Sequence, residues 1–246
     1  MKVIILAAGK GSRINKENDL MPKVLRRAKG ETLISYVIKK LPADVKQEDI
    51  YIVVGFMKEA VKEHLGDGYQ YCVQTEQLGT GHAVSMCARE LENYDGPVMV
   101  LYGDAPMFSQ ETYNGMAAAH EASGSAATIV VCDAPKDNLP PFGRIILDEA
   151  GQFTGIVEEK DCTPEQLGIT ILNVGAYVFD SRKLFSAIHD IRNDNAQGEY
   201  YLPDVAQILL SRGEKVDIYA IEDINESLGI NTYEDLQLFE QLLNEA

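Results

Sequence analysis

Near its start the chain reads Val3-Ile4-Ile5-Leu6-Ala7-Ala8-Gly9-Lys10-Gly11-Ser12-Arg13, an apolar run followed at once by two glycines and two cations. The run 3–8 is shorter than the apolar region of a signal peptide and predicts a buried strand instead. Small residues after such a strand let peptide N–H groups approach phosphate oxygens, while Lys10 and Arg13 supply positive charge. The glycine spacing matches neither a dinucleotide fingerprint nor a Walker loop. The turn is therefore either a phosphate-binding loop of another kind or an ordinary strand-to-helix turn.

Short apolar runs alternate with amphipathic segments along the first half of the chain. Strands are expected at 3–8, 50–54 and 98–102, and helices at 34–41, 60–65 and 112–122. This alternation is typical of βαβ units, and strands that are apolar throughout fit a parallel sheet covered on both faces. The pattern predicts an α/β fold with an open, mostly parallel, Rossmann-like sheet.

The pattern changes after Ala126, where strands are expected at 127–132, 144–147, 153–158 and 174–179 with few helices between them. Asp148-Glu149-Ala150-Gly151 reads as a hairpin turn. This half is expected to extend the sheet with antiparallel strands that form one wall of a pocket. Helices are expected at 182–189 and 200–210, and a terminal helix at 233–243 either docks or projects as an arm.

Composition narrows the functional class of this 246-residue chain. Its formal charge of −16 opposes general binding to nucleic acid or to anionic membranes, so an anionic ligand needs a local basic site. No apolar run approaches the ~20 residues of a membrane span. Four widely spaced cysteines without export signals suggest reduced thiols in the cytoplasm, and four scattered histidines argue against a metal cluster. We expect a cytoplasmic protein with one large domain.

Several blocks in order give the chain its resemblance to a known family. These blocks are the loop 6–13 with Pro22-Lys23-Val24-Leu25, Gln74 to Ala83, Leu101 to Asp104, Phe142 to Ile145, Gly155 to Asp161 and Asn195 to Leu202. Together they resemble the sugar-nucleotide pyrophosphorylases, and among them the uridylyltransferase domain of bifunctional bacterial N-acetylglucosamine-1-phosphate uridylyltransferases. The resemblance implies the nucleotide-diphospho-sugar transferase fold. It also implies an enzyme that joins UTP and a sugar 1-phosphate and releases pyrophosphate.

The resemblance assigns a Mg²⁺ site to Asp104 and Asn231. From the residues alone, Asp104 follows an apolar strand, where a carboxylate faces the ligand crevice of an open sheet, but a strand-end turn explains it equally well. Asn231 precedes a helix and could simply be its N-cap. Arg13 and Lys23 are candidates for stabilising negative charge on the α-phosphate and the leaving pyrophosphate, with a solvated surface lysine as the alternative for Lys23.

Further site residues rest on the same resemblance. The nucleotide-binding set is Leu6, Ala7, Ala8, Gly9, Lys10, Gly11, Gln74, Gln77, Gly79 and Thr80. The sugar-binding set is Tyr102, Gly103, Gly143, Glu158 and Asn173, and Thr80 falls in both sets. Gln74 can offer an amide donor and acceptor to uracil, although a buried glutamine bonded to nearby backbone is an alternative.

The chain departs from the family pattern at three places. Asn173-Val174-Gly175 stands where Asn-Thr-Gly is expected, which leaves the sugar open to glucose or galactosamine types. The segment after Arg13 is one residue longer, and Arg26-Arg27 replaces a common histidine and apolar residue. The chain stops at Ala246, so the acetyltransferase β-helix of the bifunctional relatives, and its trimer contact, are expected to be absent.

We therefore predict a nucleotidyltransferase domain over 1–231 followed by the terminal helix over 232–246. The resemblance implies UTP and N-acetylglucosamine 1-phosphate as substrates and UDP-N-acetylglucosamine as product, with another sugar 1-phosphate as the alternative. Mg²⁺ is the expected cofactor, and the oligomeric state is open. A non-catalytic nucleotide-sugar sensor that kept the fold is the competing hypothesis from another functional class.

Overall fold

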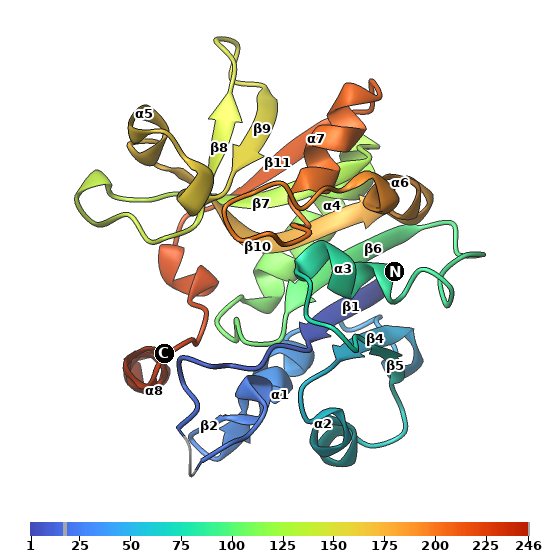
Figure 1. The fold of residues 1–246 in the computed structure, drawn as a ribbon, viewed down its shortest axis with the longest axis vertical. Helices are drawn as coiled ribbons and strands as arrows, with labels where there is room; N and C mark the ends of the chain where they lie inside the picture. The colour runs from blue at the N-terminus through green and yellow to red at the C-terminus, as the bar shows by residue number, and fades with distance from the viewer. Residues whose placement is uncertain (17–18, 246) are drawn as a thin grey trace.

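A computed structural model describes residues 1–16 and 19–245 of the chain, and its centre is one mixed sheet with helices on both faces (Figure 1). The main strands lie in the order β11-β7-β10-β6-β1-β4-β5. Their bounds are β1 Lys2–Ala7, β4 Ile50–Val54, β5 Gln70–Val73, β6 Pro97–Tyr102, β7 Ala127–Asp133, β10 Ile171–Asp180 and β11 Val216–Ile221. An open α/β sheet was predicted from the alternation of apolar and amphipathic runs, and this prediction is confirmed.

The first half of the chain forms parallel pairs around β1. Leu6 of β1 is level with Val53 of β4 and with Tyr102 of β6, so the carboxyl ends of these strands meet at one edge. Alternate β1 side chains enter different cores, because successive strand residues point to opposite faces. Ile4 packs with the apolar side chains on one face, and Val3 and Ile5 pack with those on the other.

The second half supplies the antiparallel part, but not as a simple extension at the edge. β10 lies between β6 and β7 and runs antiparallel to both, and it also pairs with the hairpin of β8 (Gly143–Leu147) and β9 (Phe153–Val157). β7 itself pairs in parallel with β11. The expectation of antiparallel strands is confirmed, because β10 runs antiparallel to β6, β7 and β8, and β8 runs antiparallel to β9.

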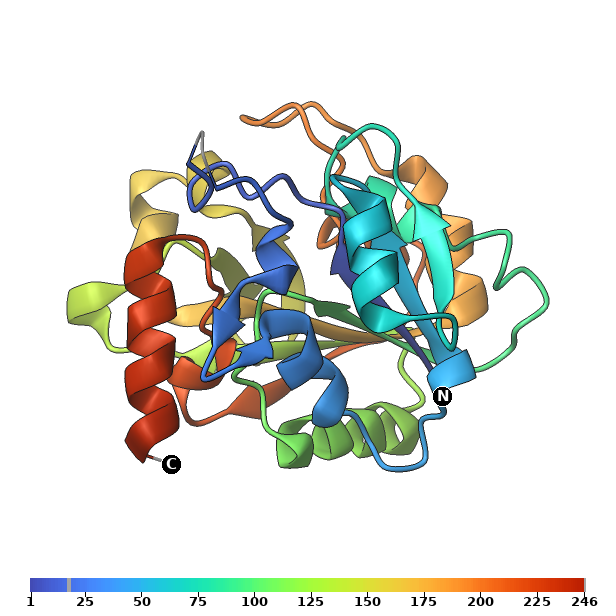
Figure 2. The same cartoon turned by 90° about the horizontal axis from the view of Figure 1, so that it is seen from below.

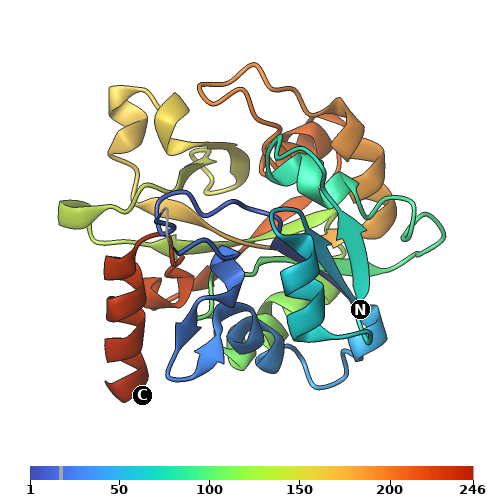
Figure 3. The same ribbon diagram turned by 60° about the horizontal axis from the view of Figure 1, so that its bottom comes forward.

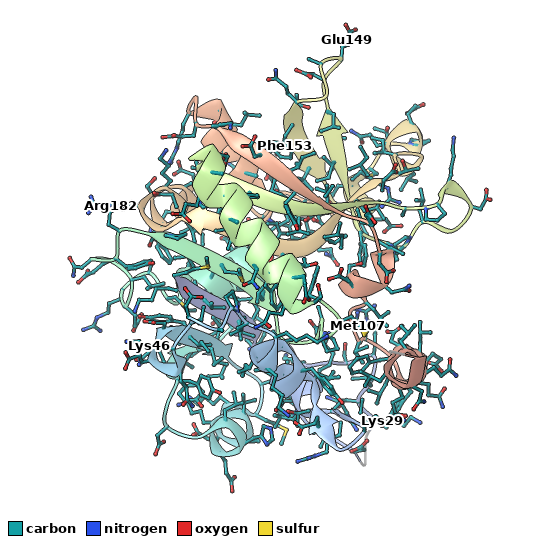
Figure 4. All side chains as sticks on the ribbon, turned by 180° about the vertical axis from the view of Figure 1, so that it is seen from behind. Lys29, Lys46, Met107, Glu149, Phe153 and Arg182 are labelled. Carbon is teal, nitrogen blue, oxygen red and sulfur yellow. The ribbon has the colours of Figure 1, made fainter. Side chains whose placement is uncertain are left out.

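Eight α-helices are defined in the described part of the chain. They are α1 Leu33–Lys39, α2 Lys58–Leu65, α3 Thr80–Ser85, α4 Gln110–Ser123, α5 Pro164–Leu167, α6 Ser181–Ala187, α7 Asp204–Ser211 and α8 Tyr233–Glu245. Apolar residues of α1, α2 and α4 join the core on one face of the sheet, and those of α3, α6 and α7 join the core on the other. Figure 4 shows α4 lying along the sheet on the side opposite to the view of Figure 1. No helix in the described residues is long and apolar enough to cross a membrane.

Helix α8 docks on the domain. Its Phe239 is fully buried in a third apolar cluster with Ile14, Leu33 and Ile230, and it meets the Tyr36 ring edge-on with the centroids 5.1 Å apart. Figures 2 and 3 show α8 standing beside the small sheet of β2 (Arg27–Ala28) and β3 (Glu31–Thr32). The terminal helix therefore packs against the segment that follows β1, which includes Ile14 and Leu33.

One predicted helix begins later than expected. The pattern predicted a helix over 200–210, but α7 starts at Asp204 after Pro203, and Tyr200 instead extends beside the neighbouring loop, with its N–H donating to Leu78 O at 2.8 Å. A proline fits the start of a helix and not its interior, so the preceding residues lie outside it. The expected hairpin turn is confirmed, since Gly151 adopts a φ of 76° and Asp148 N–H donates to Gln152 O at 2.9 Å.

Candidate active site

Two cavities open side by side at the carboxyl ends of β1 and β6, and they share Tyr102 and Asp104. The first cavity has a volume of 420 Å³ and is lined by Leu6, Ala7, Ala8, Gly9, Lys10, Lys23, Val24, Gln74, Gln77, Gly79, Thr80, Ala83, Tyr102, Asp104 and Glu199. The second has a volume of 220 Å³ and is lined by Tyr102, Asp104, Ala105, Pro141, Phe142, Gly143, Glu158, Asn173, Val174, Gly175, Tyr177, Ser227, Gly229 and Asn231. Two ligands, or two parts of one, can therefore meet at Asp104.

The first cavity is built on close backbone contacts that only small residues allow. Gly79 has a φ of 115°, and a Cβ at this position would lie 2.5 Å from Tyr200 O. Thr80, the first residue of α3, uses its hydroxyl to accept a hydrogen bond from Leu202 N at 2.9 Å. These contacts join the loop 74–80 to the segment 199–202 and leave the β1 turn open on the other side.

Gln74 faces this cavity as an acceptor. Its side-chain Nε2 donates to Gly79 O at 3.1 Å and lies 3.0 Å from His82 Nδ1, so both amide hydrogens have partners inside the protein. The Gly79 carbonyl fixes which end of the amide carries nitrogen, because an oxygen there would face another oxygen. The amide nitrogen is thus directed at groups of the protein and Oε1 is left for a ligand N–H, while the expectation that Gln74 offers both a donor and an acceptor to a base stays a prediction.

Four polar side chains from distant parts of the chain converge at the boundary of the two cavities. Lys23 forms an ion pair with Asp104 Oδ2, and its Nζ donates to Asn231 Oδ1 at 2.8 Å. Arg13 Nη2 donates to the same Asn231 oxygen at 2.8 Å. Residues separated by more than two hundred positions thus form one charged cluster, which sequence alone assigned to a shared site.

The hydrogen bonds around Asn231 show whether its side chain caps helix α8 or is available as a metal ligand. Thr232 caps α8 by accepting from Asp235 N at 3.1 Å, while Asp235 Oδ2 accepts from Asn231 N and Thr232 N at 2.8 Å each. The Asn231 side chain therefore takes no part in capping. Its Nδ2 donates to Gly229 O at 3.1 Å, which turns Oδ1 towards Lys23 and Arg13.

The Asp104 and Asn231 oxygens fit a divalent metal by their chemistry and by their placement. Both approach the same cation, the Lys23 ammonium, which shows that they converge on one point. One carboxylate and one amide oxygen make the kind of incomplete set that Mg²⁺ uses when substrate phosphates and water supply the remaining ligands. In the described residues there is no cluster of three or more His, Cys, Asp or Glu side chains that could hold a metal without such help.

The second cavity is lined by buried polar groups. Asn173 Nδ2 donates to the Tyr177 hydroxyl at 2.8 Å, and Asn173 Oδ1 accepts from Gly175 N at 3.4 Å. Gly175 has a φ of 82°, and a Cβ there would lie 2.7 Å from the Tyr102 ring. The register of β10 shifts between Asn173 and Tyr177, and both residues line the cavity together with Tyr102 of β6.

Burial raises the pKa of Glu158 to about 7, with the negative charges of Asp204 and Asp161 adding to the rise and a hydrogen bond with Asn173 opposing it. Burial also raises the pKa of Asp204 to about 6, again with Asp161 contributing. In the unfolded chain a glutamate ionises near pH 4.3, so the folded protein binds this proton more tightly. The Glu158 contribution to the free energy of unfolding is present below about pH 4.5 and is lost as the pH rises through about 7.

Replacing Glu158 by Gln is therefore expected to raise the free energy of unfolding at pH 8 relative to the wild-type protein, and to change it little at pH 4.5. The expected gain is about 2 kcal/mol, below the full value of about 1.36 kcal/mol per pKa unit because the side chain is partly exposed. Urea unfolding at both pH values measures it. Glu149→Gln, at the tip of the hairpin that projects into solvent in Figure 4, is the matched control. An equal effect of both variants at pH 8 would contradict the role of burial.

The structure brings most of the predicted site residues to the two cavities. Gly11, Arg13 and Gly103 do not line them: Gly11 packs against Lys23, Arg13 reaches the cluster through Asn231, and Gly103 N donates to Leu6 O at 2.9 Å behind the site. Lining residues that were not among the predicted ligands include Val24, Ala83, Glu199, Tyr177 and Ser227. Glu199 stood inside a recognised block, whereas nothing in the apolar run around Tyr177 marked its hydroxyl.

The comparisons with known proteins agree with this fold. The nucleotidyl transferase family matches residues 2–243 of the chain. The chain is 43% identical over 229 residues to the bifunctional protein GlmU of Lactobacillus gasseri and 41% identical over 228 residues to that of Pediococcus pentosaceus, covering 93% of this chain in each case. It spans about half, 48%, of the length of these relatives.

A solved structure from Bacillus anthracis, provisionally assigned as a glucose-1-phosphate thymidylyltransferase and determined with sucrose, aligns with a TM-score of 0.78. The alignment covers 100% of this chain and 96% of that one at 23% identity, so it bears on the fold alone. The family match extends over nearly the whole chain and includes both cavities. The chain belongs to the nucleotidyl transferase family.

Proposed function

We propose that the protein transfers the uridylyl group of UTP to N-acetylglucosamine 1-phosphate, giving UDP-N-acetylglucosamine and pyrophosphate. The observation that carries this proposal is the meeting of the two cavities at Asp104, with Lys23 and Asn231 at the same boundary. A transfer between two phosphorylated substrates needs such a boundary, because the two reacting phosphates must come together while the base and the sugar lie apart.

The first cavity suits the nucleotide. The β1 turn offers backbone N–H groups beside Lys10 to the phosphates, and Gln74 Oε1 accepts from an imide N–H such as that of uracil. Cytosine has an acceptor at the equivalent ring position, so a Gln74 that presents Oε1 disfavours it. Glu199 also lines this cavity.

Asp104 and Asn231 would hold Mg²⁺, which in this position would shield the triphosphate charge and stabilise the charge that develops during transfer. Lys23 lies within reach of both oxygens and, once substrates bind, can turn its ammonium to the α-phosphate. Arg13 is held at the same oxygen of Asn231 and supplies a second cation for the leaving pyrophosphate.

The chemistry requires no protein nucleophile. The phosphate oxygen of the sugar 1-phosphate attacks the α-phosphorus of UTP, the bond from that phosphorus to the bridging oxygen of the β-phosphate breaks, and pyrophosphate leaves with the electron pair. Sugar phosphates are largely ionised near neutral pH, so no general base is needed to prepare the attacking oxygen. The protein contributes alignment and positive charge.

The second cavity suits the sugar, since Asn173, Glu158 and Tyr177 present amide, carboxyl and hydroxyl groups around a small space. Val174 lines this space where the family resemblance led us to expect threonine. The missing hydroxyl makes a sugar 1-phosphate of the glucose or galactosamine type the second candidate substrate.

A substrate panel tests the proposal. Purified protein is assayed for pyrophosphate release with UTP, CTP and dTTP against N-acetylglucosamine, glucose and galactosamine 1-phosphates, with Mg²⁺ and with a chelator. We expect the highest kcat/KM for UTP with N-acetylglucosamine 1-phosphate, and no release in chelator. Highest kcat/KM with glucose or galactosamine 1-phosphate would establish the second candidate, and binding of UTP without release under any condition would establish a non-catalytic sensor.

A further inference from the structure

Arg26 lies outside both cavities yet is almost completely buried, with 6% of its surface exposed. Its guanidinium spans several acceptors: Nη2 donates to Asn15 Oδ1 and to Asp19 O at 2.7 Å each, and Nη1 contacts Asp19 Oδ2 and donates to the Tyr233 hydroxyl at 3.2 Å. The planar fork of arginine can reach these separate partners at once, which a single ammonium cannot. A buried arginine with this many partners fixes the positions of the segments that carry them.

Asn15 connects Arg26 to the loop after β1. Its Nδ2 donates to Lys10 O at 2.8 Å and to Met21 O at 3.0 Å, so one side chain bridges the two ends of this loop. Its own N–H donates to Gly11 O at 3.0 Å, closing a tight turn. The amide can hold both carbonyls only while its oxygen points to Arg26, because the guanidinium sets the direction of the side chain.

This turn carries Arg13. Ile14, the residue between Arg13 and Asn15, is fully buried in the cluster with Phe239 of α8. Burial of Ile14 and the hydrogen bonds of Asn15 therefore fix the turn, and Arg13 of the same turn donates to Asn231. The positions of Lys10 and Arg13 therefore depend on the hydrogen bonds of Asn15 and on the burial of Ile14.

The start of α8 meets the same loop at a second point. Tyr233 accepts from Arg26 and donates to Asp19 Oδ2 at 2.7 Å, and Lys16 Nζ lies 4.8 Å from the centre of its ring. These hydrogen bonds from Tyr233 and Arg26 lower the pKa of Asp19. Two residues upstream, Asn231 holds Arg13 and Lys23. The loop after β1 and the start of α8 are thus joined at two places: through Asn231 at the boundary of the cavities, and through Tyr233 outside them.

We propose that Arg26 is a positioning residue for the nucleotide phosphates: through Asn15 it holds the turn that presents Lys10 and Arg13, and through Tyr233 it locks that turn to α8. This inference rests on the proposed function, because it assigns Lys10 and Arg13 to the triphosphate. It predicts that the loss of Arg26 weakens phosphate binding in the first cavity and leaves Asn173 and Glu158, which line the second cavity, in place.

The test compares Arg26→Ala and Arg26→Lys with Arg27→Ala, which removes an exposed neighbour whose guanidinium contacts Gly30 O. We expect both Arg26 variants to bind UTP and pyrophosphate at least about tenfold more weakly by calorimetry, and kcat/KM for UTP to fall by about 10²-fold, since small displacements of aligned groups have effects of this size. Binding of N-acetylglucosamine 1-phosphate and the properties of Arg27→Ala are expected to match those of the wild-type protein.

Tyr233→Phe serves as a milder variant if Arg26→Ala does not fold, because it removes one hydroxyl and keeps the ring. It is expected to show the same preferential loss of pyrophosphate binding over sugar-phosphate binding, at smaller size. Equal weakening of both ligands, or unchanged pyrophosphate binding in folded Arg26→Lys, would overturn the inference. Binding is measured apart from turnover, so a wild-type protein that binds UTP but transfers nothing would refute the proposed function alone.

Discussion

Replacing Asp104 by Asn is expected to lower kcat by about 10³-fold, because a metal ion and its charge supply several kcal/mol of transition-state stabilisation and each 1.36 kcal/mol or so is tenfold in rate. The variant keeps the shape of the side chain and removes a carboxylate that lines both cavities. It also takes from Lys23 its ion-pair partner. Steady-state pyrophosphate release at saturating UTP and sugar phosphate measures the change.

Asp95→Asn provides the control for this prediction, since Asp95 pairs with Arg182 on the surface and both side chains are more than half exposed. It is expected to keep wild-type turnover. A second readout separates metal binding from general damage: raising Mg²⁺ is expected to recover part of the lost rate in Asp104→Asn only if the variant binds the ion more weakly. Turnover by Asp104→Asn within about threefold of the wild-type rate would remove Asp104 from the reaction, given the size of metal effects.

Replacing Lys23 by Met is expected to lower kcat by about 10²- to 10³-fold, the loss that follows removal of one preorganised group aimed at developing charge. Methionine has a similar length and leaves the apolar part of the side chain in place, so packing against Gly11 is largely kept. Only 15% of the Lys23 side chain is exposed, so its charge acts on a nearby phosphate with less screening by water than a surface lysine would have.

The separate effects of Lys23→Met on kcat and on KM distinguish a role in catalysis from a role in UTP binding. A lysine that acts in the transition state lowers kcat when removed, whereas one that only helps UTP to bind raises KM at constant kcat. Lys46→Met is the control, because Lys46 lies on the surface beside Glu48 with 73% of its side chain exposed. A variant with unchanged kcat and a higher KM would reassign Lys23 from catalysis to substrate binding.

Sequence patterns predicted the parts of the fold that depend on local burial. The runs around Ile5, Ile52 and Val100 are apolar throughout, and each forms a strand of the central sheet buried on both faces. β5 and β11 were missed, because Gln70–Val73 is short and the polar Asp217 interrupts the apolar pattern of β11. The place of β10 could not be predicted either, since pairing partners depend on contacts between distant segments and not on the pattern within one strand.

In the candidate site, too, some residues could be predicted from their local sequence and others could not. Asp104, Lys23 and Gly79 stand at strand ends or in loops with recognisable neighbours, so resemblance and local chemistry led to them. Tyr177 sits within an apolar strand, where its hydroxyl has no distinguishing signal until Asn173 is seen beside it. The orientation of the Gln74 amide depends on the Gly79 carbonyl and on His82, whose positions only the folded structure provides.

The insertion of β10 between β6 and β7 has a consequence for how the protein is made. Until Tyr177 to Asp180 leave the ribosome, the edge of β6 that they later cover has no strand partner. The emerging chain therefore carries a strongly apolar strand with one unpaired edge for the time needed to synthesise some eighty further residues, a state prone to association with other chains. Completion of the sheet is consequently a late event, and slow translation before β10 would prolong the interval in which a chaperone has to shield β6.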